Sequence, residues 1–178
     1  DERIEKSFMI KKDSGTKFHK SFFMAMKHVP TSTAQEKKFN TKTGAVYLDE
    51  RAAKAKKTLD DALSKFDKLI PVKFEFPSQR ELNLARSLDT KVETKVHRGL
   101  QGAVKLKTIW CFPEGDSIEQ KDGKPKTTKP DTDNLIKQFK DVMAQRGWFN
   151  KGDQQVADEQ TIKIHSKTTG IFVDISEI

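Results

Sequence analysis

The apolar residues of this chain alternate along its length between the spacing of a strand and that of a helix. From Asp49 to about Leu69 they recur every three or four residues, which predicts an amphipathic helix. From 103 to 112 they alternate with polar residues, as in a half-buried strand. Helical spacing returns near Leu135 and ends at Gly147. This pattern predicts a sheet with helices packed on it.

The remaining segments complete the expected order of elements. Residues 21–30 read as a strand, and the polar stretch that follows reads as a loop or loose hairpin. Two strands, joined at "SKTTG", are expected between 156 and 175. The order strand, helix, strand, helix, strand, strand predicts a single domain of the α/β (α+β) class with a mixed β-sheet. Residues 1–20 are expected to be a peripheral lead-in to a domain of residues 21–178.

Charge points to a polyanionic partner. The 178 residues include 34 Lys and Arg against 26 Asp and Glu, which gives a net charge of +8. Such a balance suits nucleic acid, although charge that only keeps a loop solvated remains the alternative. Candidate phosphate contacts lie within the polar stretch after the first strand and just before the second helix: Lys37, Lys38, Lys124, Lys126 and Lys129.

Cysteine content, hydropathy and histidine spacing limit which other classes of protein the chain can belong to. The single Cys111 cannot form an internal disulfide, and its apolar surroundings "KTIWCFP" predict a packing role. No apolar run approaches the roughly 18 residues of a membrane span. We therefore expect a soluble, cytoplasmic protein with no membrane partner. The four histidines lack metal-ligand spacing, so a zinc site is not expected.

Three carboxylates and one lysine form the candidate site. Asp131 and Asp133 enter the second helix in "KPDTDNLIKQFKD", and Asp153 lies in the turn after it. Lys137 is four residues past Asp133 and shares its helix face. Carboxylates are the ligands that Mg²⁺ takes when it also binds phosphate. A 14-residue helix spans about 21 Å, so Asp153 reaches the helix start only along the next strand, or across a dimer or neighbouring element.

Ordinary structural roles compete with this interpretation. Aspartates at a helix N-terminus cap it and suit its dipole, and Asp133 with Lys137 could form an i,i+4 ion pair. An EF-hand is excluded because its sixth position, counted from Asp131, is Ile136 rather than glycine. Trp148 and Phe149 could stack on DNA, but aromatics after a helix are more often core residues.

Two separated blocks, "KPDTDNLIKQFKDVM" and "RGWFNKGDQQV", resemble the RusA family of Holliday junction resolvases. The first block matches its Pro-Asp-x-Asp-Asn-Leu-x-Lys helix start, which includes Asn134 as a supporting residue. The second matches an Asp followed closely by Gln-Val on a strand. The strong resemblance covers residues 129–178, including a closing hairpin. Residues 71–102 match nothing in the family pattern and are expected to be an insertion that modifies dimerisation or DNA contacts.

The resemblance implies a function and a set of roles. Asp131, Asp133 and Asp153 would bind Mg²⁺, and Lys137 would assist at the phosphate. The family acts as a homodimer that nicks two opposed strands of a four-way DNA junction symmetrically, leaving ligatable ends. Many members carry an acidic pair where this chain has Gly152-Asp153. The alternative is a junction-binding or phage regulatory protein whose nuclease activity is lost or secondary.

Overall fold

The alternating stretch from Val104 to Phe112 forms strand β6, as predicted, inside a four-stranded sheet. The computed structural model describes residues 17–178 without 33–36, 40, 45, 49 and 114–120. The strands follow the order β1–β8–β6–β7, with the remaining bounds β1 His19–Ala25, β7 Val156–His165 and β8 Gly170–Glu177. Strand β6 is parallel to β7 and antiparallel to β8, so the sheet is mixed, as expected.

The two last strands do not form the closing hairpin that the sequence suggested. Strand β8 pairs with β6 and with β1, and β6 separates it from β7. The chain between β6 and β7 passes through a helix, which is the connection that parallel neighbours require. Strand β6 is the most apolar of the four, with Val104, Leu106 and Trp110 fully buried, so its central place removes the most apolar surface from water.

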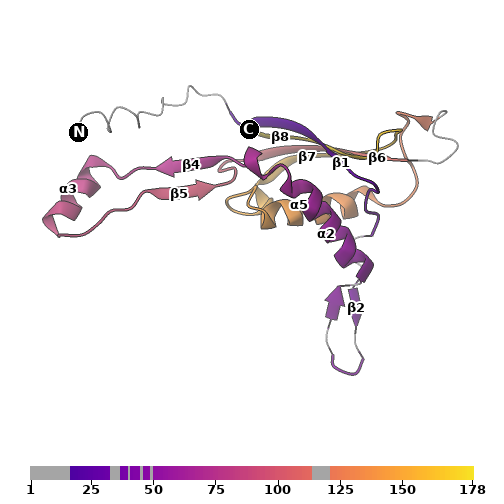
Figure 1. Ribbon diagram of the computed structural model, residues 1–178, viewed down its shortest axis with the longest axis horizontal. Helices are drawn as coiled ribbons and strands as arrows, with labels where there is room; N and C mark the ends of the chain where they lie inside the picture. Colours follow the sequence, from indigo (N-terminus) through magenta and orange to yellow (C-terminus); the bar gives the residue numbers. More distant parts are fainter. Residues whose placement is uncertain (1–16, 33–36, 40, 45, 49, 114–120) are drawn as a thin grey trace.

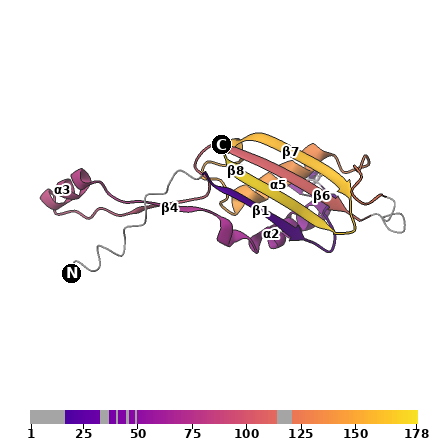
Figure 2. The same ribbon diagram turned by 90° about the horizontal axis from the view of Figure 1, so that it is seen from above.

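Two helices cover the same face of this sheet (Figures 1 and 2). They are α2 (Glu50–Ser64) and α5 (Thr132–Gln145). Their apolar faces pack against the strands, and Phe139 of α5 meets the Trp110 ring edge-on at 6.0 Å. Helix α2 ends earlier than predicted, because a separate 3₁₀ turn, η1 (Asp67–Leu69), forms before Pro71. No helix in the described ranges is long and apolar enough to cross a membrane.

An arginine at the end of α5 ties the two helices together. Arg146 donates from Nε and Nη2 to the carboxylate of Asp67, and from Nη1 to Asp60 Oδ1 at 2.8 Å. The Arg146 side chain is 20% exposed. Its hydrogen bonds hold the pKa of Asp67 below the ordinary value of 3.8.

Replacing Arg146 with Met is expected to destabilise the fold in a pH-dependent way. A carboxyl with a depressed folded-state pKa adds stability above its unfolded pKa and loses it as pH falls through the folded pKa. The variant should therefore lose about 1–3 kcal/mol of unfolding free energy at pH 7. The deficit should shrink below about pH 3.8. Denaturant unfolding at pH 7 and below pH 3.8 measures the deficit. The control is Arg86→Met, which changes an exposed arginine in the same way. An equal deficit at the two pH values would contradict the role of the Asp67 carboxylate.

The N-terminal part departs from the expected lead-in. Residues 1–16 lie outside the described part, and His19 and Lys20 already belong to β1, so the domain begins before residue 21. The polar stretch after β1 contains a short antiparallel pair, β2 (Lys37–Phe39) and β3 (Val46–Leu48), in agreement with the predicted hairpin.

Most of the segment that was expected to be an insertion forms an arm that extends away from the sheet (Figures 1 and 2). Residues 71–98, called the arm below, contain β4 (Val72–Glu75), α3 (Gln79–Ser87) and β5 (Lys95–Arg98). Strands β4 and β5 pair only with each other among the described strands, and α3 forms the tip. A capping box starts α3, with Ser78 and Glu81 bonded reciprocally.

Candidate active site at the start of helix α5

Helix α5 begins at the pair of aspartates singled out by the sequence. Asp131 is the N-cap residue, with an extended backbone, and its carbonyl accepts the first helical bond from Leu135 N at 3.2 Å. Its carboxylate makes no capping hydrogen bond. Asp133 lies in the first turn, and both side chains are exposed. The positive end of the helix dipole favours these two negative charges.

Of the structural roles that competed with metal binding, the helix dipole remains, but the side-chain cap and the ion pair are not formed among the described residues. Within the described residues, Asp133 and Lys137 form no ion pair, although both are exposed and one helical turn apart. The carboxylates of Asp131 and Asp133 also have no hydrogen-bond donor there. Two carboxylates therefore face solvent unengaged at one helix end, with an ammonium group on the same face.

The loop before α5 is held to the end of β7 by a lysine that sequence reasoning missed. Lys163 Nζ donates to Thr128 O at 2.8 Å and to Pro130 O at 2.6 Å. Lys163 pairs in register with buried Trp110, so its side chain lies on the helix-covered face of the sheet. Because side chains alternate along a strand, its apolar neighbours Ile162 and Ile164 would place Lys163 on the outward face, so the sequence carried no local signal for this role. Lys163 thus positions the start of α5.

Two of the predicted DNA-contacting lysines remain exposed on this loop. The backbone from 123 to 126 bonds to β7 through Lys126 N to Lys163 O at 3.0 Å. Lys124 and Lys129 point to solvent, whereas Lys126 Nζ donates to Thr128 Oγ1 at 2.6 Å and lies 5.5 Å from the Phe112 ring centre. Lys37 and Lys38 belong to β2, whose side chains lie outside the described part.

Asp153 lies at the far end of the helix. It begins the 3₁₀ turn η3 (Asp153–Gln155), which precedes β7, whereas Lys163 and the start of α5 lie near the end of β7. The seven residue-to-residue steps of strand from 156 to 163 span roughly 23 Å. The structure therefore brings Asp131, Asp133 and Lys137 together within one chain but leaves Asp153 apart. No group of three metal-ligating side chains forms in the ranges described.

The turn that carries Asp153 is firmly built. Gln155, buried at 9% exposure, donates from Nε2 to Leu100 O at 2.9 Å and to Gly102 O at 2.8 Å. Its Oε1 accepts from Lys151 N at 2.6 Å. Trp148 and Phe149 before it are buried, which confirms that they pack in the core. Cys111 is buried too, as expected, and burial raises the pKa of its thiol.

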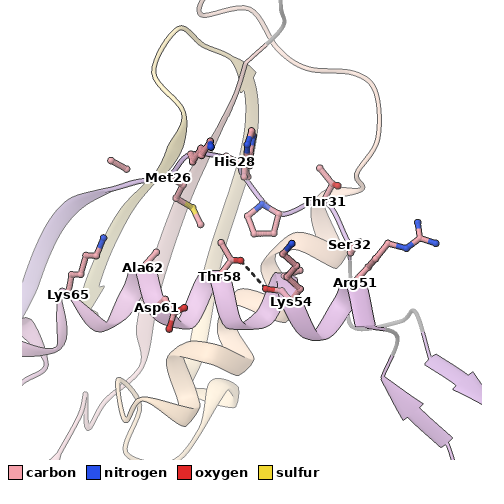
Figure 3. Close-up of a pocket in the computed structure, with 15 residues that line it drawn as sticks. Met26, His28, Thr31, Ser32, Arg51, Lys54, Thr58, Asp61, Ala62 and Lys65 are labelled. Carbon is pink, nitrogen blue, oxygen red and sulfur yellow. Dashed lines mark hydrogen bonds between the residues drawn. The ribbon is translucent and has the colours of Figure 1, made fainter.

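A basic groove that the sequence did not reveal runs along α2 (Figure 3). Its volume is about 570 Å³, and it lies between α2 and the segment 26–32. Helix α2 contributes Arg51, Lys54, Thr58 and Asp61, Lys65 follows its last residue, and the segment adds Lys27 and His28. The spacing of three and four residues along α2 was the signal for this shared face. The groove can accommodate an anionic group, with Asp61 as the one acid in its lining.

The residues present at the start of α5 fit a divalent cation that prefers oxygen. Asp131 and Asp133 offer unengaged carboxylate oxygens, and Asn134 Oδ1 is a buried acceptor with no donor among the described residues. Mg²⁺ is commonly held by one or two carboxylates, with waters and substrate phosphates completing its shell. The donor set thus suits Mg²⁺ with positions left for DNA.

Comparison with known proteins identifies the second half of the chain. A family model described as "Endodeoxyribonuclease RusA" matches residues 78–176, which is more than half of the 178 residues. The match begins at the N-cap of α3 and includes both blocks of the candidate site. No curated protein matches the chain.

Proposed function

The chain belongs to the RusA family of endodeoxyribonucleases, and we propose that it is a Mg²⁺-dependent nuclease that resolves four-way DNA junctions by paired symmetric nicks. The observation that carries this is the start of α5, where two unengaged carboxylates and Lys137 share one exposed helix end. Membership of the family makes the chain an endonuclease; the metal, the junction and the pairing of the nicks are the proposal.

Asp131 and Asp133 would hold the metal, which when bound lowers the pKa of a water and offsets charge on the phosphoryl oxygens. Hydrolysis joins a water oxygen to phosphorus and breaks one phosphorus–ester bond, with the proton passing to the departing oxygen. Lys137 faces the same phosphate and stabilises the charge that develops on its free oxygens. Lys163 keeps the helix start in place by its bonds to Thr128 and Pro130.

Asp153 would act in the metal site of a second copy of the chain. Its own α5 start lies at the other end of β7, so Asp153 of one subunit would complete the metal site begun by Asp131 and Asp133 of the other. A homodimer of this kind contains two equivalent sites related by a twofold axis. A four-way junction offers two opposed strands in matching symmetry, which accounts for paired nicks.

Lysines around the helix start supply the sequence-independent part of DNA binding. Lys124, Lys126 and Lys129 adjoin the acids, and Lys37 and Lys38 lie on the β2–β3 pair that precedes α2. The basic groove along α2 is a further place for a phosphate of a junction arm. Contacts to phosphates release counterions, so binding should weaken steeply with salt.

Cleavage of a synthetic four-way junction by the wild-type chain, with and without Mg²⁺, tests the proposal. A junction-binding protein that has lost its nuclease activity would bind the same DNA and leave it intact under both conditions.

A further inference from the structure

The exposed apolar side chains of this protein are concentrated on the arm. Seven of the eight large hydrophobic side chains found exposed in the described residues belong to it: Val72, Phe74, Phe76, Leu84, Leu88, Val92 and Val96. Phe74 is 50% exposed, Phe76 is 55% exposed and Val96 is 60% exposed. Single exposed hydrophobic residues are ordinary, but a contiguous group marks an interaction surface.

The register of the two strands gathers the apolar side chains of the ribbon itself on one face. Val72 and Phe74 alternate along β4, and Phe74 lies directly opposite Val96 of β5. The rings of Phe74 and Phe76 are stacked with centroids 6.5 Å apart. The other face is polar, and there His97 Nε2 pairs with Glu75 Oε2 at 2.9 Å. The arm is thus an amphipathic ribbon with one apolar and one charged face.

Neither the arm nor the sheet covers this apolar face. An isolated two-stranded ribbon is marginally stable in water, so a ribbon with such a face gains stability from a partner. A buried Phe removes about 150–250 Å² from water. The seven half-exposed side chains of the ribbon and of the tip around α3 together offer on the order of 500–700 Å². A partner that covers both parts of the arm would bury an area close to the roughly 800 Å² of each side of a standard interface.

The arm is joined to the turn that carries Asp153. At its root, Gly99 N bonds to Pro71 O at 2.9 Å, and Leu100 N bonds to Trp148 O at 2.8 Å. Gly99 has φ +88°, and a Cβ there would lie 2.6 Å from Gly147 O, so only glycine fits. Gln155, two residues past Asp153, bonds to Leu100 O. These bonds fix the root of the arm relative to Asp153, so a partner bound to the arm is positioned relative to Asp153 as well.

We propose that the arm is the dimerisation element of this protein, with its apolar face buried against a second copy of the chain. The inference rests on the proposed function in one respect, since the second copy is the one that the metal site needs to receive Asp153. The apolar face is a poor match for DNA, because Arg98 is the one cation in register with it. A twofold pair of arms would bring together like apolar faces, as an isologous interface requires.

The mass of the protein in solution tests whether the arm forms the dimer interface. It is measured for the wild-type chain and for variants of the apolar face. The wild-type chain should have about twice the monomer mass of 20.3 kDa in light scattering after gel filtration. Phe74→Ser with Val96→Ser should yield the monomer mass with unchanged circular dichroism, because both side chains lie outside the core. The matched control, Lys73→Ser with Lys95→Ser on the opposite face, should remain dimeric.

A crosslink adds a readout that does not depend on affinity. Cys111 is buried, so a Val96→Cys chain treated with a short bismaleimide should give a covalent dimer, and a Lys73→Cys chain much less. A monomeric wild-type chain, or a Phe74→Ser/Val96→Ser chain that stays dimeric, would overturn the inference. Neither readout involves DNA cleavage. A Phe74→Ser/Val96→Ser chain that stays dimeric would remove the arm and leave the nuclease proposal standing, and a dimeric wild-type chain without nuclease activity would leave the arm standing. A monomeric wild-type chain would also remove the metal site shared between subunits.

Discussion

Replacing Asp133 with Asn is expected to slow cleavage of a four-way junction by about 10²–10⁴-fold, because losing a metal ligand removes several kcal/mol of transition-state stabilisation. Junction binding should be retained or slightly tightened, since a negative charge near the phosphates is removed. Single-turnover cleavage gives the rate, and a gel-shift titration at fixed salt gives the affinity.

Asp141→Asn is the matched control, because it makes the same chemical change on the same helix. Asp141 lies eight residues beyond Asp133, about 12 Å along α5. Its variant should cleave at nearly the wild-type rate. Full cleavage by Asp133→Asn, or an equal loss in both variants, would remove Asp133 from the site.

Mixing two inactive chains should restore cleavage if Asp153 acts across the dimer. One chain carries Asp131→Asn with Asp133→Asn, and the other carries Asp153→Asn. In a mixed dimer, one site combines the intact pair of the second chain with the intact Asp153 of the first, and the other site has neither. Random exchange makes roughly half of the dimers mixed, and each should nick one strand of the junction.

The activity of the mixture distinguishes an Asp153 that acts in the partner's site from one that acts in its own subunit. If each subunit used its own Asp153, both sites of the mixed dimer would be defective and the mixture would stay inactive. A chain with all three aspartates changed, mixed with either partner, serves as the negative control. Activity of Asp153→Asn alone would show that this carboxylate is not a ligand.

Much of the fold follows from apolar spacing, and the misses have physical causes. The alternation in β6 and the helical spacing of α2 and α5 were decisive because one face of each element is buried. The order of strands was missed at β8, since spacing within a strand carries no information about which neighbour it pairs with. The elements of the arm could not be predicted from apolar spacing, because its apolar residues face away from the protein's own core.

The site was predictable in part for a similar reason. Asp131, Asp133 and Lys137 are neighbours along one helix, so their spacing alone brought them together. The separation of Asp153 depends on where β7 begins relative to α5, and that is a property of the whole sheet. Lys163 acts through contacts 33 and 35 residues distant in sequence, which local patterns do not reveal.

Junction cleavage by the wild-type chain tests the central claim most directly. A synthetic four-way junction, labelled on each strand in turn, is incubated with Mg²⁺ or with a chelator, beside linear duplexes of the same sequences. We predict nicks at symmetric positions on two opposed strands, only with Mg²⁺, and little cleavage of the duplexes. A junction that is bound but stays intact with Mg²⁺, or cleavage that persists in the chelator, would contradict the account.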